Sequence, residues 1–129
     1  MGFVAALLCG MMLLSLPAAA ERPPEQRSQA AFVVKGVVTD VTTTKRGFDD
    51  YYRITIKVSE VQKGAIREGA SLVVTTFQMV RKPPPGFVGP SGHGAPPPKG
   101  ATIMAYVSDR KENGGYEAIY KDWYDLVTQ

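Results

Sequence analysis

The chain has one histidine and one cysteine, which excludes chemistry that needs a cluster of either. Cys9 alone cannot build a disulfide framework or a cysteine-ligated zinc site. Ser91 lies two residues before His93, and serine with histidine is the pairing of a nucleophile and its general base. Such a pair needs a rigid scaffold and an acidic group that orients the base, and the glycine-rich surroundings predict neither. We therefore expect no enzyme, no metal and no cofactor, and we expect His93 to be a partly exposed loop residue.

Two acidic clusters offer paired carboxylates, the side chains that calcium sites and glycoside hydrolases use. The first is Asp49-Asp50, and the second is Asp122 with Asp125. Neither has the alternating aspartate spacing of a calcium loop, and each is flanked by aromatic residues and loops. We expect both clusters to be solvated turn residues.

Several basic side chains lie in and around residues 51–59, where a strand is predicted. On the exposed face of that strand they would form a positive stripe. Next to aromatic rings, such a stripe resembles the platforms on which single-stranded nucleic acids stack. Four carboxylates interrupt it, and the net charge of +3 is only weakly basic, so we expect no nucleic-acid partner. Arg53 and Lys57 are kept as candidate binding residues. The whole stripe is Lys45, Arg46, Arg53, Lys57, Lys63 and Arg67.

Residues 81–100 form the most unusual segment, with seven prolines and five glycines in twenty residues. Its two Pro-Pro-Pro runs favour extended polyproline conformation, which suits a stiff ridge that docks into an aromatic groove of a partner. Alternatively, Phe87 and Val88 plug a β-barrel, and this structural reading is favoured. If the segment binds, its candidate contact residues are Phe87, Pro90, His93 and Pro97.

The first twenty residues contain no charged side chain and have the layout of a secretory signal peptide. The apolar run 3–16 is too short to span a membrane as a helix, and small residues precede Glu21. We expect cleavage after Ala20 and a secreted or periplasmic mature protein without cysteine. An uncleaved N-terminal anchor is the alternative, and lipid attachment at Cys9 is a third possibility.

The mature chain is long enough for one domain and too short for two. Residues 21–30 predict a flexible leader, and residues 31–129 a single β-domain. The clearest strand is 51–59, where apolar and polar residues alternate without a break. Further strands are expected at 31–42 with a bulge near Thr39-Asp40, at 71–80, at 101–108 and at 116–121. Between them lie a loop at 43–50 and a polar turn at 109–115, and an apolar tail at 123–127 packs back on the domain.

Five strands with a long connection between the third and the fourth predict a small OB-like Greek-key barrel, an all-β fold. A β-sandwich is the alternative, although five strands are few for one. The expected core is Phe32, Val34, Val38, Tyr52, Ile54, Ile56, Val58, Val73 or Val74, Ile103 and Ala105.

Several short motifs resemble those of the OB-fold domains in tissue inhibitors of metalloproteinases and netrin-like modules. They are F-x-V-x-G-x-V from Phe32, the alternating second strand that leads to Val61-x-Lys63-Gly64, and Pro98-Lys99-Gly100 before Tyr106. The resemblance implies an OB-fold over roughly residues 30–120. The animal inhibitors chelate zinc through an N-terminal cysteine, and the predicted mature chain begins with Glu21 instead, so that role is assigned to no residue.

We expect an exported, non-catalytic binding or structural module whose partner is an envelope protein, a secreted protein or a small ligand. The fold resemblance suggests an inhibitor of a secreted hydrolase as the alternative. An oligonucleotide-binding domain is the third possibility.

Overall fold

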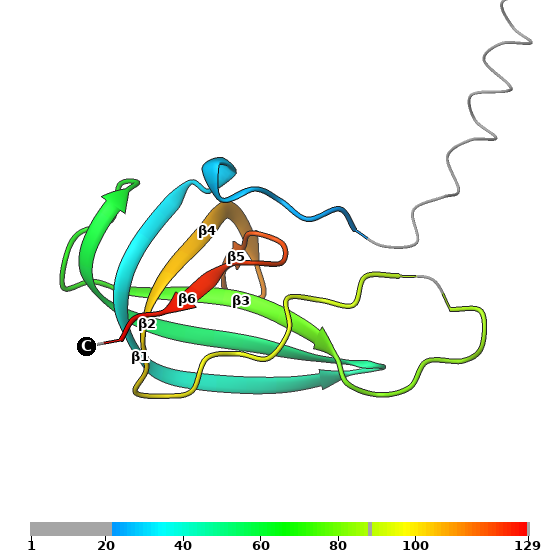
Figure 1. Cartoon of the computed structure of the whole chain (residues 1–129). Helices are drawn as coiled ribbons and strands as arrows, with labels where there is room; N and C mark the ends of the chain where they lie inside the picture. Colours follow the sequence, from blue (N-terminus) through cyan, green and yellow to red (C-terminus); the bar gives the residue numbers. More distant parts are fainter. Residues whose placement is uncertain (1–21, 88, 129) are drawn as a thin grey trace, which may run out of the picture.

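The computed structural model describes residues 22–87 and 89–128, and these are almost entirely β-structure, which confirms the predicted all-β class (Figure 1). The predicted signal peptide, residues 1–20, lies outside the described residues. One turn of 3-10 helix, η2 (Arg27–Gln29), precedes the strands, and the described part of the chain has no helix long and apolar enough to cross a membrane. The strands are β1 (Phe32–Arg46), β2 (Asp49–Lys63), β3 (Ser71–Met79), β4 (Thr102–Glu112), β5 (Gly115–Ala118) and β6 (Tyr124–Leu126).

Five strands close into a ring. β1 pairs with β2, β2 with β3, β3 with β5, β5 with β4, and β4 returns to β1. Every pair is antiparallel except β3–β5, which is parallel and short. β6 pairs in addition with β4. Residues 80–101 connect β3 to β4, and Figure 1 shows this connection swinging out beyond the end of β3 and running back past the strands to the start of β4.

The core fills the inside of the ring with one face of each strand. On β2 the alternation predicted from the sequence is confirmed, because even-numbered positions from 52 to 58 are buried while Arg53 and Lys57 are exposed. Of the two predicted core candidates on β3, Val73 and Val74, it is Val74 that is buried in the core. Phe32 of β1, also predicted to be in the core, is only partly buried at its edge. The other predicted core residues are all buried: Val34, Val38, Tyr52, Ile54, Ile56, Val58, Ile103 and Ala105.

β1 bends so that it can pair with β2 and β4 at once. Its register with β2 shifts at three places: between Val33 and Val34, between Lys35 and Gly36, and between Val38 and Asp40. The last of these shifts confirms the bulge predicted from the change of parity. At Gly36 the two strands approach so closely that a β-carbon would overlap the carbonyl oxygen of Lys57. Glycine is therefore required at this bend.

Two turns show what the sequence did and did not predict. The prediction of a loop over residues 43–50 is wrong. β1 continues to Arg46 and β2 begins at Asp49, so only Gly47 and Phe48 form the turn. The threonines at 42–44 are β-branched and extend the hairpin opposite residues 51–53. The second turn, predicted over residues 109–115, is shorter than expected, because β4 continues to Glu112 and β5 begins at Gly115. The predicted Asn113-Gly114 pair does form the turn, with φ values of 52° and 85°, as a tight hairpin turn needs.

Candidate functional site

Phe87, in the proline- and glycine-rich connection, does not plug the ring. Phe87 is 41% exposed and packs edge-on against Phe48 of the β1–β2 turn, with 5.2 Å between ring centres. The expectation that Phe87 plugs the ring is therefore wrong, and its companion Val88 lies outside the described residues. Pro90 is exposed, whereas Pro97 is buried. The candidate contact residues of this segment are thus not gathered on one surface.

His93 is buried, with 7% of its surface exposed, so the expectation of a partly exposed loop residue is wrong. It lies where β3 and β5 separate, and its ring bridges them. Nδ1 accepts a hydrogen bond from the backbone N–H of Phe77 at 3.2 Å, and Nε2 lies 3.2 Å from the carbonyl oxygen of Ala118. The geometry selects the neutral ring with its proton on Nε2, and burial lowers the pKa of His93 to about 4. Neither ring nitrogen is available to act as a base for Ser91.

The backbone around His93 forms an isolated antiparallel bridge at the edge of β3, between Gln78 and Gly92. The N–H of His93 donates to the carbonyl of Phe77 at 2.7 Å, and the N–H of Met79 donates to Ser91 at 2.9 Å. Gly92, between them, approaches β3 so closely that a β-carbon would overlap the Phe77 carbonyl oxygen. The segment therefore covers backbone groups that β5 leaves unpaired, which is a structural task.

A stack of aromatic rings runs along the outer face beside His93. The rings of Tyr51 and Phe77 are 5.5 Å apart, and those of Phe77 and Tyr120 are 6.1 Å apart, both pairs tilted by only 21°. The guanidinium of Arg46 covers Tyr51 at 5.0 Å, and that of Arg22 covers Tyr120 at 4.6 Å. Each ring of the stack is therefore covered by a neighbour, which stabilises it by stacking and cation–π attraction. Within the stack of Tyr51, Phe77 and Tyr120, no flat ring face is left open for a ligand.

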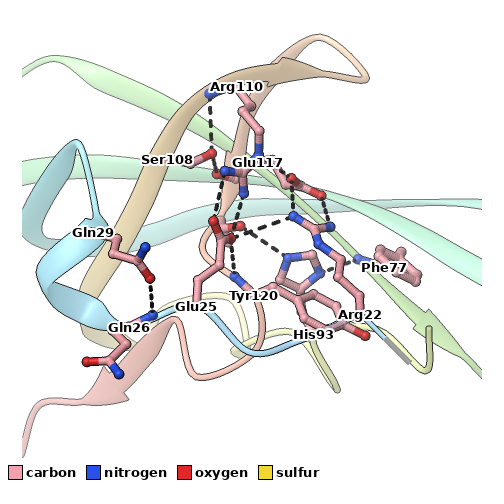
Figure 2. A network of polar contacts seen from close by, with 11 residues as sticks. Arg22, Glu25, Gln26, Gln29, Phe77, His93, Ser108, Arg110, Glu117 and Tyr120 are labelled. Atoms are coloured by element: carbon pink, nitrogen blue, oxygen red, sulfur yellow. Dashed lines mark hydrogen bonds and ion pairs between the residues drawn. The ribbon is translucent and has the colours of Figure 1, made fainter. Parts of the chain in front are cut away.

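Figure 2 shows a network of ion pairs beside this stack. Arg22 donates to both carboxylate oxygens of Glu117 at 2.9 and 3.0 Å, and Arg110 donates to both of Glu25 at 2.9 and 2.6 Å. Burial acts to raise the pKa of Glu117, but hydrogen bonds from Arg22 and Arg110 outweigh it and leave that pKa below its ordinary value. Glu25 also accepts from the N–H of Tyr120 at 2.9 Å. These contacts tie residues 22–25 to β5 and the chain that follows it, although the sequence predicts a flexible leader there.

The acidic clusters are paired with arginines. In the first cluster, Arg81 lies 3.0 Å from a carboxylate oxygen of Asp50, and burial raises the pKa of Asp49. Both aspartates are half-buried, so the expectation that they are solvated turn residues is wrong. The second cluster is exposed, as predicted, and both of its carboxylates bind Arg27. Within residues 22–87 and 89–128, no group of three potential ligands is placed to hold a metal ion.

Arg53 and Lys57 lie on the outer face of β2, exposed as predicted, but away from the proline-rich segment. Lys57 is opposite Ser71 at the start of β3. Arg53 lies against the β4–β5 turn, since a β-carbon on Gly114 would be 3.1 Å from its Nη2. Neither side chain has a carboxylate partner among the described residues. The predicted stripe is therefore divided, with Arg46 on the ring of Tyr51, Arg53 against the β4–β5 turn and Lys57 opposite the start of β3.

Two hollows share the side chain of Tyr116, and we call them together the Tyr116 groove. One is about 410 Å³ and follows the β4–β5 hairpin, lined by residues 111–116. The other is about 330 Å³ and lies between Tyr116, the loop after β2 and the start of β3. Tyr116 is held in place by the ring of Phe32 at 5.1 Å, and Nζ of Lys111 lies 5.6 Å from its centre. The second hollow is lined by Phe32, Ala65, Ile66, Arg67, Ala70, Ser71, Leu72 and Tyr116.

Sequence reasoning missed this groove because its walls come from four separate segments. One local signal was present: two glycines, Gly114 and Gly115, directly precede Tyr116. Gly115 lies so close to Val73 that a β-carbon would overlap its carbonyl oxygen. That contact places the following tyrosine at the junction of β3 and β5.

Comparison with protein-family models, curated proteins and solved structures gives no match for this chain.

Proposed function

We propose that this chain is an exported, non-catalytic binding module built on an OB-like Greek-key barrel, with the Tyr116 groove as its ligand site. The strand order β1-β2-β3-β5-β4 with return to β1, and the parallel β3–β5 pair, support the barrel proposal. The long connection between β3 and β4 then covers the edge of β3. Export is supported by the uncharged, apolar segment of the first twenty residues.

The observation that carries the binding function is the contrast between the groove and the rest of the surface. Elsewhere the arginines are paired with carboxylates or cover aromatic rings, and the single histidine has both nitrogens engaged. The groove combines the apolar side chains of the second hollow with cations, Arg67 and Lys111 in its lining, that have no carboxylate partner among the described residues. Concave, largely apolar sites with a few polar groups are typical of ligand pockets.

A screen of small aromatic and aliphatic acids by saturation-transfer NMR tests this proposal on the domain that begins at Glu21. We expect weak binders whose signals disappear in Ser71→Trp, because a bulky side chain at this exposed position fills the second hollow. Phe87→Ala is the matched control, because it removes an exposed aromatic ring from the proline-rich segment instead.

Signals lost in Phe87→Ala and kept in Ser71→Trp would move the site to the proline-rich segment. A complete lack of binders to the wild-type domain would contradict the binding function. Thermal unfolding of both variants verifies that each is folded.

A further inference from the structure

The charges around the Tyr116 groove favour an acidic ligand. Arg67 and Lys111 line the groove, Arg53 lies against Gly114 of the lining, and Lys57 is paired with Ser71 of the lining. None of these four cations has a carboxylate partner among the described residues. Glu112 in the lining and Glu68 beside Arg67 offset part of this charge and leave two positive charges in excess. By contrast, four arginines elsewhere, Arg22, Arg27, Arg81 and Arg110, are each held by carboxylates.

The spacing of these cations suits an extended chain. Arg53 and Lys57 lie on the same face of β2, four residues apart, which corresponds to about 13 Å along a strand. An extended peptide repeats the same spacing between its residues i and i+4, and residue i+2 lies on the same face between them. The second hollow adjoins Ser71, opposite Lys57, and its apolar side chains, Phe32, Ile66 and Leu72, offer burial to an apolar side chain of such a peptide.

We propose that the Tyr116 groove binds an acidic peptide segment in extended conformation, with an apolar side chain in the hollow and carboxylates on the surrounding cations. This inference rests on the proposed binding function and names the partner class for the same site. Single-stranded nucleic acid fits less well, because bases need open ring faces for stacking. The rings of Tyr51, Phe77 and Tyr120 are covered, and Tyr116 has Phe32 on one side and Lys111 over its face.

Fluorescence anisotropy with labelled peptides tests the proposal on the domain that begins at Glu21. The probes are Glu-Asp-Trp-Asp-Glu, the same peptide with a central glycine, the basic analogue Lys-Lys-Trp-Lys-Lys, and a five-residue oligothymidylate. We expect the first probe to bind at least tenfold more tightly than each of the other three. Raising the salt concentration from 50 to 300 mM should weaken the binding of the first probe severalfold, since exposed charges are screened within about 10 Å at 0.1 M salt.

Variants on and off the groove complete the test. Arg67→Glu and Lys111→Glu should each weaken the acidic peptide at least tenfold, whereas Lys82→Glu and Lys99→Glu, on exposed residues of the proline-rich segment, should change it less than twofold. Equal effects of all four substitutions, or equal binding of the acidic and basic peptides, would overturn the proposal. Tighter binding of the oligothymidylate would replace the acidic peptide with nucleic acid. If these peptides fail while small acids still bind in the NMR screen, only the partner class is refuted.

Discussion

Lowering the pH should destabilise this domain through its single histidine. The pKa of His93 is about 4 in the folded chain and 6.5 in the unfolded chain, so unfolding takes up a proton between these values. The neutral ring contributes its full stability above pH 6.5, and that contribution is lost as the pH falls toward 4. Between pH 7.5 and 5.0 the loss is about 2 kcal/mol, at about 1.36 kcal/mol for each pKa unit. For a domain of this size that lowers the melting temperature by about 8 °C.

Thermal unfolding followed by circular dichroism at pH 7.5, 6.5, 5.5 and 5.0 measures this loss. His93→Gln is the control, because an amide retains one donor and one acceptor but does not titrate. Glu25 and Glu117, whose pKa values lie below the ordinary 4.5, act only at lower pH. The difference between wild type and variant therefore isolates the histidine. Parallel pH profiles of the two proteins, or an NMR titration of the ring near pH 6.5, would refute the buried, neutral His93.

Three substitutions, two of them with a matched control, test the packing by urea unfolding. Gly92→Ala should lower the free energy of unfolding by about 2 kcal/mol or more, because Gly92 has a φ of 101° and a β-carbon there would overlap the Phe77 carbonyl. Gly86→Ala is its control: Gly86 has a φ of 80° but lies in open space, so the loss should be only about 1 kcal/mol. Ile54→Ala should cost about 2–5 kcal/mol, because Ile54 is fully buried. Thr55→Ala, on the opposite face of β2, should cost less than about 1 kcal/mol. Equal losses would mean that the inner face of β2 is misassigned. Phe87→Ala should cost less than about 1.5 kcal/mol, since its ring is 41% exposed and packs edge-on against Phe48. A cost of several kcal/mol would instead support Phe87 as a plug of the ring.

The strands were predictable where one local pattern decided the outcome. Residues 52 to 58 alternate without interruption, so both the strand and its buried face follow from period two alone. The bulge after Val38 followed from a change of parity, and the β4–β5 turn from Asn113-Gly114. The 43–50 hairpin was missed because charged and glycine residues at 45–50 outweighed the β-branched threonines before them.

The candidate site depended on contacts between distant segments, and these leave little local trace. His93 follows a glycine in a loop-like sequence, and only the separation of β3 and β5 creates the slot that buries it. Arg22 and Glu25 belong to a proline-containing leader whose partners lie about ninety residues away. Arg53 and Lys57 were found from the sequence because exposure on a strand is a local property. Tyr116 was not, because its role depends on Phe32 and the loop after β2.

A map of backbone amide shifts tests the central claim most directly. The ¹⁵N-labelled domain is titrated with the peptide Glu-Asp-Trp-Asp-Glu, and the shift changes are assigned residue by residue. A ligand in the Tyr116 groove predicts changes concentrated at residues 65–72 and 111–116 and at the outer face of β2 from Arg53 to Lys57. Changes concentrated at residues 82–90 instead, or no change at saturating peptide, would contradict the assignment of this groove as the binding site.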